Sequence, residues 1–496
     1  MLSSTVHSYY FEVILTTIAL LFGAIYYFTR NKKDPRYPSG PKPIPLLGNV
    51  LQIGNNPLRT FQKWAEEYGP IYSLRLGTQD AVIINDPKLV KELFSERSSA
   101  GRPFNPFTHF FGKGKGIVNA GGPELEAQRR FTLRKLRDVG LLKSSIEEAL
   151  MEEANTLIRF FERKAGKPIS GKRLFNGPVV NAIWRLVSGE SNDWDSATKP
   201  EIVEGSEEVI KHVHIYLILL EYIAPGFFGW TQWVNAVNNF MRITSVAVDK
   251  HTDKLDVHNP RDFIDHYLVE MQETKDPASS FYKENGRKNL EAIVGDLFVA
   301  GTETSSTTLS WAWLYLLKNK DIQRRAQKEL DLIVGESRQP SLSDKPLLPY
   351  TEAILLETLR LSGVAPLGAP HRMTADTLFK GYFLPKDLTV ISDLYTIHHD
   401  PKIWGQDANV FRPERFLNEA GDAVVRHEAF AAFSFGRRQC IGEGFARDAL
   451  FLFIASILHK FNIDPDPDSP VVDTEPMPGI LVEHQPFKCI MNLRKH

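Results

Sequence analysis

The feature that most constrains the fold is the segment 290–318, which contains no proline and sets a few polar residues in an apolar background. Proline breaks helices because it removes a backbone donor and clashes with the preceding turn, so its absence permits one unbroken helix. At 1.5 Å per residue that helix would be about 43 Å long, enough to cross a whole domain. The segment therefore predicts a body built mainly from helices.

Strand-like patterns are short and few by comparison. They occur at residues 71–76, 81–84 and 388–391, and helical patterns fill most of the sequence between them. We expect a mainly α fold with a minor β region, in which one or two small sheets lie beside a large helical body.

The N-terminus carries an uncharged apolar run at residues 13–28. No Lys or Arg precedes the run and large aromatic residues end it, whereas a cleaved signal peptide has a basic start and a small-residue cleavage site. The basic residues, from Arg30 to Arg36, follow the run, which favours a cytosolic body. We expect a lumenal N-terminus over 1–10 and a single-pass signal-anchor transmembrane helix over 11–29, rather than a buried core helix.

Residues 30–47 form a basic hinge with prolines at positions 35, 38, 41, 43 and 45. Proline at this density favours a stiff, extended backbone, so the hinge would hold the domain at a fixed offset from the membrane. No Gly/Ser linker, repeat or long charge run divides the remaining chain, and we expect residues 48–496 to form one domain. The formal net charge of −1 gives no basic field that would suggest a nucleic-acid partner.

The two cysteines lie far apart in the sequence, which excludes a disulfide framework and favours a reducing compartment. Cys489 lies in an apolar stretch, and a buried inert thiol is its expected role. Cys440 instead follows two arginines, in a glycine-bounded loop at the start of an apolar helical stretch. Helix dipoles and guanidinium groups lower a thiol pKa, so we expect Cys440 to be a thiolate, either a nucleophile or a metal ligand.

The residues around Cys440 help to decide between these uses. A zinc site needs about four ligands, and the sequence has no paired Cys/His spacing. A cysteine hydrolase needs an orienting His and Asn/Asp pair, which nothing in the sequence indicates. The pattern F-x-x-G-x-R-x-C-x-G is matched in full from Phe433 to Gly442, and here the chain resembles the cytochrome P450 family.

This resemblance implies haem b as the cofactor, with Cys440 as the axial ligand of its iron. It implies that Phe433, Gly436 and Gly442 shape the loop that approaches the porphyrin face. It also implies that Arg438 neutralises a haem propionate.

Two further propionate contacts follow from the resemblance, Arg129 and His371. In the family a tryptophan lies four residues before the arginine, but this chain has Leu125 there. Because leucine cannot donate a hydrogen bond, we expect one propionate contact to be missing or replaced.

The sequence from Ala300 to Ser305, AGTETS, lies in the middle of the long helix. Ser and Thr side chains compete for backbone carbonyls, so a kink that eases packing is the simpler interpretation. The segment also resembles the oxygen-activation segment of the P450 family, in which an acid–alcohol pair delivers protons for O–O cleavage. The resemblance therefore implies that Glu303 and Thr304 are catalytic.

Glu357 and Arg360 share a helix face and can form an ion pair. The resemblance joins them to Arg415 in a buried triad that supports the haem loop. Their expected role is in folding and haem retention rather than in turnover.

The resemblance places an apolar substrate pocket among four regions, at residues 104–111, 298–300, 364–367 and 479–481. A phenylalanine cluster such as that at 104–111 is more often ordinary core, but the glycines that follow it favour the pocket. The aromatic run 225–230 would be costly to expose to water, so we expect it to dip into the membrane interface and admit lipophilic substrate.

Together these motifs imply a haem-thiolate monooxygenase. It would insert one atom of O₂ into a steroid, a sesquiterpenoid or fatty-acid derivative, or a foreign lipophile, by hydroxylation or epoxidation. No flavin or dinucleotide motif is evident, so electrons from NADPH would arrive through NADPH–cytochrome P450 reductase, with cytochrome b5 as a further partner, at the endoplasmic reticulum membrane.

Two alternatives remain open at this point. A haem-thiolate isomerase or dehydratase does not need an acid–alcohol pair, so Glu303 and Thr304 count against it. A catalytically silent haem-binding protein is favoured only by Leu125.

Overall fold

The computed structural model describes residues 33–45, 47–103, 112–138, 144–171, 174–194, 200–211, 229–469 and 473–495, together with Thr16, Thr17 and Gly23. Nearly all of the anchor predicted at 11–29 lies outside the described residues, as do the phenylalanines predicted to line a pocket at 104–111 and most of the run 225–230. Within the described part of the chain, no helix is long and apolar enough to cross a membrane.

Most of the described chain is helical, as the sequence predicts. The α-helices are α2 (Val50–Ile53), α3 (Pro57–Tyr68), α4 (Pro87–Ser95), α6 (Gly122–Asp138), α7 (Ser144–Lys164), α8 (Asn176–Ser188), α9 (Glu201–Lys211), α11 (Trp230–Asp253), α12 (Phe263–Glu273), α13 (Lys283–Lys318), α14 (Lys320–Ile333), α15 (Pro349–Ser362), α16 (Leu394–His399), α17 (Pro401–Trp404) and α18 (Glu443–Lys460). Short 3₁₀ helices are η1 (Arg97–Ser99), η2 (Gly112–Gly114), η3 (Leu342–Leu347), η4 (Pro413–Phe416) and η5 (Gly436–Arg438).

Three small sheets make up the β region. The largest has the order β1 (Ile71–Leu76), β2 (Gln79–Ile84), β7 (Thr389–Ser392) and β4 (His371–Arg372). The second has the order β3 (Pro168–Ser170), β9 (Lys488–Leu493) and β8 (Phe461–Pro465), and the third pairs β5 (Thr377–Phe379) with β6 (Tyr382–Leu384). The three strands predicted from sequence are β1, β2 and β7, so this part of the prediction is confirmed.

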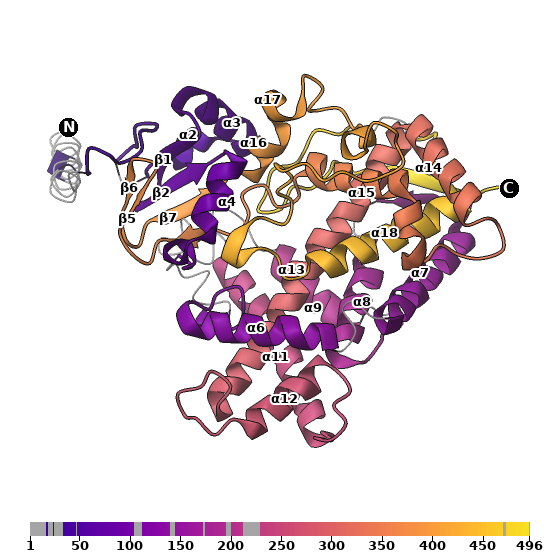
Figure 1. Ribbon diagram of the computed structural model, residues 1–496, viewed down its shortest axis with the longest axis horizontal. Helices are drawn as coiled ribbons and strands as arrows, with labels where there is room; N and C mark the ends of the chain where they lie inside the picture. The colour runs from indigo at the N-terminus through magenta and orange to yellow at the C-terminus, as the bar shows by residue number, and fades with distance from the viewer. Residues whose placement is uncertain are drawn as a thin grey trace, which may run out of the picture.

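Helix α13 is the long helix predicted from sequence, and it begins seven residues earlier than expected. Its 36 residues correspond to about 54 Å of helix. Figure 1 shows it running through the helical body, while β1, β2, β5, β6 and β7 gather with α2, α3 and α4 at the N-terminal end of the molecule.

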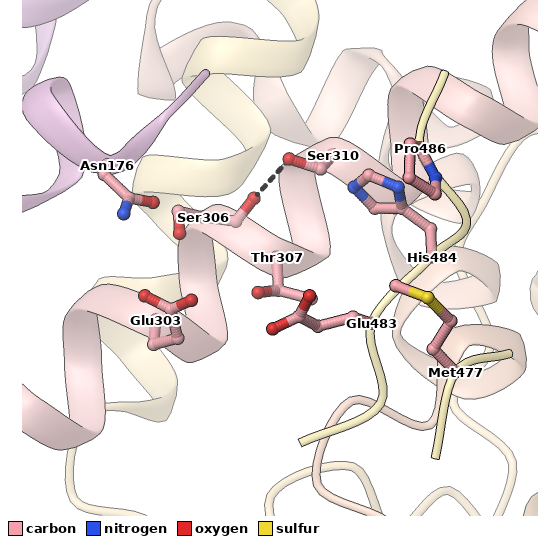
Figure 2. A pocket seen from close by; sticks show the side chains of 9 residues that line it. All are labelled: Asn176, Glu303, Ser306, Thr307, Ser310, Met477, Glu483, His484 and Pro486. Atoms are coloured by element: carbon pink, nitrogen blue, oxygen red, sulfur yellow. Dashed lines mark hydrogen bonds between the residues drawn. The ribbon is translucent and has the colours of Figure 1, made fainter. Parts of the chain in front are cut away.

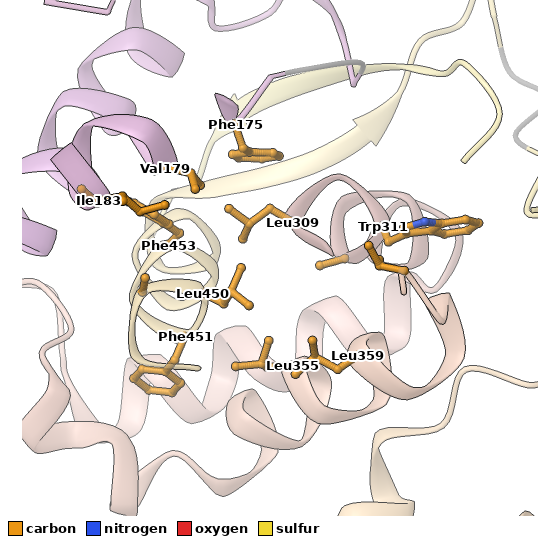
Figure 3. Packing of buried hydrophobic residues seen from close by; sticks show 14 of the residues in the cluster. Phe175, Val179, Ile183, Leu309, Trp311, Leu355, Leu359, Leu450, Phe451 and Phe453 are labelled. Carbon is orange, nitrogen blue, oxygen red and sulfur yellow. The ribbon is translucent and has the colours of Figure 1, made fainter. Parts of the chain in front are cut away.

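The core surrounds the second half of α13. Apolar side chains of α8, α13, α15 and α18 meet there, including Val179, Leu309, Leu355 and Phe453 (Figure 3). Nearly every residue of α13 from 302 to 317 is buried although positions 302–308 carry polar side chains, so this half of the helix is enclosed all round rather than amphipathic. The core therefore fixes the position of α13 on every side.

The described part of the proline hinge, 33–45, lies against β1. Ser73 donates from its hydroxyl to the carbonyl of Pro38 at 2.7 Å and from its backbone N–H to the carbonyl of Ser39 at 2.8 Å. A Cβ on Gly40 would lie 1.8 Å from the carbonyl oxygen of Ser73, so only glycine permits this approach. The hinge is thus fastened to the sheet rather than detached from the domain.

The predicted ion pair within α15 is confirmed. The Arg360 guanidinium donates from Nε and Nη2 to the two carboxylate oxygens of Glu357, each at 2.7 Å, and both side chains are fully buried. Arg415 of η4 joins them with Nε 3.3 Å from Glu357 Oε1. This triad ties α15 to the segment that leads towards Cys440.

Candidate active site

The loop before α18 owes its shape to a close contact with α4. Gly436 has φ +74°, and a Cβ there would lie 2.1 Å from the carbonyl oxygen of Phe94, so the backbones touch and no side chain fits. The N–H of Cys440 donates to the carbonyl of Phe433 at 3.0 Å, which closes the turn. Gly442 then forms the N-cap of α18.

Cys440 combines an accessible side chain with close surroundings. Its side chain is exposed, yet it is surrounded closely enough that burial raises the pKa of the thiol above its ordinary value. Backbone N–H groups of Gly442 and Glu443, and the charge of Arg129, oppose this increase only in part. The expectation that the protein's own charges make Cys440 a thiolate is therefore wrong, and a bound metal ion would be needed to remove the proton.

Cys489 behaves as predicted. It is fully buried in β9, and burial raises its pKa to about 12.

Arg438 does not point at the sulfur. It donates from Nε to the carbonyl of Ala100 and from Nη1 to the carbonyl of Ile117, each at 2.9 Å, and from Nη2 to the carbonyl of Ala120. Arg129, on α6, donates to the carbonyl of Gln439 beside Cys440. Arg129 therefore lies beside Cys440, whereas Arg438 contacts Ala100 and the segment 117–120.

A third arginine, Arg102, belongs to the same cluster and was missed in the sequence. It donates from Nε to the carbonyl of Val118 at 2.9 Å and from Nη1 to the carbonyls of Ala369 and Pro370. The sequence could have indicated this role through the Gly-Arg-Pro triplet at 101–103, in which a charged residue interrupts an apolar stretch.

The cluster carries surplus positive charge. Burial, and then repulsion by Arg102 and Arg129, lower the pKa of Arg438 to about 8, while the carboxylate of Asp296 on α13 opposes this. Burial likewise lowers the pKa of Arg102 to about 10. Three guanidinium groups thus share one nearby carboxylate, and an additional anion would relieve their repulsion.

His371, on β4, is a neutral neighbour of these arginines. Its Nδ1–H donates to the carbonyl of Ser99 at 2.9 Å, and its ring stacks on Phe94 at 3.6 Å between centroids. Burial first, and then the charges of Arg102 and Arg438, hold the pKa of the ring well below its ordinary value. The neutral ring therefore offers only the lone pair of Nε2, and it could donate to an anion there only after gaining a proton.

One row of α13 begins beside the arginine cluster. Asp296 lies beside the arginine cluster, and Ala300 and Thr304 follow it at successive intervals of four residues, which places all three on one side of the helix. Ala300 is exposed although it lies in the middle of a helix that the core surrounds. The Thr304 hydroxyl donates to the carbonyl of Ala300 at 2.7 Å.

Glu303 lies on the adjacent row and is buried. Its side chain lines a small polar pocket with Thr307 (Figure 2), and Thr304 is not among the residues that line this pocket. The predicted acid and alcohol are therefore neighbours in sequence that lie on adjacent rows of the helix.

The other sequence predictions have mixed outcomes. Leu125 is buried in the core one turn before Arg129, so nothing polar occupies its position. Phe298 is also core, with its ring 5.0 Å from that of Trp184, and does not line a pocket. The regions 364–367 and 479–481 do meet, because the N–H of Val482 donates to the carbonyl of Val364 at 2.9 Å.

Comparison with known proteins agrees with this arrangement. The family model described as cytochrome P450 matches residues 38–491. Farnesoate epoxidase of Bombyx mori is 32% identical over 97% of this chain and 99% of its own length. Cytochrome P450 2B4 of Oryctolagus cuniculus is 35% identical over 91% and 93%, and cytochrome P450 2J2 of Homo sapiens is 34% identical over 91% and 90%. The chain therefore belongs to the cytochrome P450 family.

Proposed function

We propose that this enzyme is a haem-thiolate monooxygenase that acts on a lipophilic substrate. The observation that carries the proposal is the combination of an accessible Cys440 thiol, an arginine cluster with surplus positive charge, and the Asp296–Ala300–Thr304 row of α13 that begins at this cluster. The thiol can ligate iron, the guanidinium groups can bind carboxylates, and the Thr304 hydroxyl can donate a proton.

The residues present fit haem b. Porphyrin brings two carboxylates, which match the surplus charge of Arg438, Arg129 and Arg102. Cys440 would supply the thiolate ligand of the iron, and His371 would donate from Nε2 once a haem carboxylate beside it favours the protonated ring, because its Nδ1–H is already bonded to Ser99. Gly436 and Gly442 would let the Cys440 loop approach the porphyrin without an obstructing side chain. Phe433 would keep the turn closed, because its carbonyl accepts from the N–H of Cys440.

Bound haem would supply the reductive activation of O₂, for which protein side chains have no equivalent. The chain's own task is to provide protons. One oxygen atom enters the substrate and the other leaves as water, which consumes two electrons and two protons. The Thr304 hydroxyl holds a proton that it can donate. Glu303, the preceding residue of α13, is the acid that would replace this proton.

Electrons would come from NADPH through a separate membrane reductase, with cytochrome b5 as a second donor. The hinge supports a location at the endoplasmic reticulum membrane, because it fixes the domain to the segment that precedes residue 33. The domain would then face the cytosol.

The name of the Bombyx mori relative gives it farnesoate as substrate and epoxidation as reaction. For this chain we propose the wider class of unsaturated, branched lipophiles, hydroxylated or epoxidised, with steroids and foreign lipophiles as the remaining candidates. The half-buried Leu367 and Leu481 belong to the regions that would contact them.

The test is spectroscopic first and catalytic second. Purified protein, reduced and exposed to carbon monoxide, should show the thiolate-shifted Soret band, and a Cys440→Ser variant should lose it. A titration with terpenoid acids and esters, steroids and foreign lipophiles should identify ligands that displace water from the ferric haem.

The ligands so identified should then support NADPH consumption and an oxygenated product when reductase is added. Conversion of a peroxide without reductase would favour the isomerase or dehydratase alternative. A normal carbon monoxide spectrum with no NADPH consumption for any ligand would overturn the monooxygenase proposal and favour a silent haem-binding protein.

A further inference from the structure

The polar pocket beside Thr304 is small and rich in groups that exchange protons. Its volume is about 30 Å³, and its lining includes Asn176, Glu303, Thr307, Glu483 and His484 (Figure 2). One water needs about 10–15 Å³ on this measure, so the pocket has room for about one or two water molecules. It is far too small for an organic substrate.

A buried acceptor in this pocket lacks a protein partner. The Asn176 side chain donates from Nδ2 to Glu207 Oε1 at 3.1 Å, but its Oδ1 is buried without a hydrogen bond. A buried carbonyl left unbonded is costly, and an adjoining polar cavity of this size normally holds the water that satisfies it. The pocket is therefore hydrated.

The occupant is water rather than a metal ion. In the described part of the chain, one group of three His, Cys, Asp or Glu side chains brings its ligand atoms within 4.8 Å of one another, and that is His251 with Asp262 and Asp265, well away in sequence. The acids and the imidazole of the pocket are thus spread around its wall, as suits a water network.

Two adjacent rows of α13 connect this pocket to the proposed catalytic alcohol. Glu303 and Thr307 lie one turn apart and face the pocket, whereas Ala300 and Thr304 lie one turn apart on the adjacent row. Glu303 therefore both lines the pocket and directly precedes the proposed catalytic alcohol.

The segment 477–486, between β8 and β9, forms the outer wall. It is anchored to α13 by Trp311, whose Nε1–H donates to the carbonyl of Val482 at 3.1 Å. Glu483 is half-buried in this wall and Pro486 is exposed, so the wall reaches from solvent to the pocket. His484 is buried, and its Nδ1–H donates to the carbonyl of Gln485 at 2.8 Å, which leaves Nε2 as the nitrogen that can gain and lose a proton.

We propose that Glu483 and His484 form the entry of a proton relay that recharges Glu303 through the waters of this pocket. Each proton that Glu303 gives up on the Thr304 side is replaced by one taken from solvent at Glu483 or His484 and passed along one or two waters. No bond other than O–H and N–H bonds is made or broken. The inference rests on the proposed monooxygenase function and adds to it the source of the protons.

A double variant, E483Q/H484Q, keeps polarity and size but removes both titratable groups. In the haem-containing enzyme with reductase we expect NADPH-driven product formation to fall about 10-fold, less than the roughly 10²- to 10⁴-fold effect of a lost acid–base group, because water can partly replace the two side chains. Turnover driven by hydrogen peroxide should stay within about twofold, since peroxide arrives with its protons already bound. The control is E475Q, an exposed carboxylate of the same region that pairs with Arg59, and it should change neither rate.

A second measurement does not depend on activity. A high-resolution crystal structure of the haem-containing enzyme should show at least one ordered water bonded to Asn176 Oδ1, and the chain of waters should reach the Glu303 carboxylate. A dry pocket would overturn the relay.

The remaining kinetic outcomes are also decisive. If the double variant keeps its NADPH-driven rate, the relay does not exist, and if both rates fall together, Glu483 and His484 are structural. If the wild type forms no product by either route although its carbon monoxide spectrum is normal, the monooxygenase proposal itself fails, and the relay with it.

Discussion

His251 joins three helices because both of its ring nitrogens face oxygen atoms. Nδ1 lies 2.8 Å from the carbonyl of Ala247 on α11, and Nε2 lies 3.2 Å from the carbonyl of Ser188 at the end of α8 and 3.1 Å from Asp262 Oδ2 at the start of α12. Carbonyl oxygens only accept hydrogen bonds, so both nitrogens must carry hydrogen and the ring must be cationic. Burial alone would lower its pKa, but these bonds outweigh it and raise the pKa to about 9.

A pKa raised on folding makes stability depend on pH in a defined direction. The contribution of His251 should be complete below about pH 6.5, its unfolded pKa, and should disappear as the pH rises through about 9, with a size of roughly 3 kcal/mol. The thermal unfolding midpoint of the wild type should therefore fall between pH 6.5 and 9.5 by more than that of H251Q, which cannot titrate. H258Q, at an exposed histidine, should keep the wild-type profile; equal profiles for H251Q and wild type would contradict this assignment.

The arginine cluster gives a second prediction at the residue scale. If Arg438 binds a haem carboxylate, R438Q should release haem faster by about 10- to 100-fold, the effect of losing a charge-assisted hydrogen bond. The measurement is the rate of haem transfer to excess apomyoglobin. R437Q is a suitable control, because the Arg437 side chain is largely exposed and bonds outward to the carbonyl of Ser95. Equal rates for the two variants would remove Arg438 from the set of haem contacts.

At the scale of elements, α13 holds the loop 112–118 by two side chains. Asp296 Oδ2 accepts from the N–H of Ile117 at 2.7 Å and of Val118 at 2.9 Å, and Asn289 Oδ1 accepts from the N–H of Gly116 at 3.1 Å. In the same loop, the carbonyl of Ile117 accepts a hydrogen bond from Arg438, and the carbonyl of Val118 accepts one from Arg102. This loop is therefore held between α13 and the arginine cluster.

Removing the carboxylate should release the loop locally. In D296A we expect the amides of Ile117 and Val118 to exchange with solvent about 10- to 100-fold faster, the effect of losing about one to two hydrogen bonds. Hydrogen–deuterium exchange of peptides that cover 112–118 measures this. D249A removes a carboxylate that pairs with Arg287 at 2.8 Å and should leave these peptides unchanged. Unaltered exchange in D296A would show that the arginines alone retain the loop.

At the scale of the whole molecule, the Glu357 triad couples distant parts of the chain. Besides Arg360 and Arg415, the backbone N–H of Arg412 donates to Glu357 Oε1 at 3.0 Å, so a single buried carboxylate holds α15 against the approach to η4. Breaking a buried pair by removing one charge costs about 3–5 kcal/mol, a large part of the 5–15 kcal/mol that a typical protein has.

E357Q should therefore yield little folded, haem-containing protein, and what is recovered should unfold well below the wild type. Expression yield, the carbon monoxide spectrum and the thermal midpoint report this. R325Q breaks an exposed pair with Glu414 and should cost about 1 kcal/mol or less. A wild-type midpoint for E357Q would mean that the triad's arginines are satisfied by the carbonyls around them.

Much of this fold could be predicted from the sequence, because its signals are local. The proline-free stretch of α13, the strand patterns of β1, β2 and β7, and the Glu357–Arg360 spacing are each set by residues that are neighbours in the sequence. The Cys440 loop was found by its glycines, one of which proves to touch the backbone of Phe94.

What the sequence could not give depends on residues that are far apart. Arg102 joins Arg438 only through the folded loop between α4 and α6, and the raised pKa of Cys440 reflects burial that no local pattern records. His484 and Glu303 line one pocket although about 180 residues separate them. Such groupings are properties of the packed molecule.

The parallel pairing of β2 with β7, from Ala81 beside Thr389 to Ile84 beside Ser392, has a consequence for synthesis in the cell. A ribosome makes β7 about 300 residues after β2, which takes about 15–60 s at 5–20 residues per second. Throughout that time the apolar edge of β2 has only β1 as a partner, and an open edge attracts other chains. The nascent protein should therefore need chaperone protection at this hairpin until translation has passed Ser392.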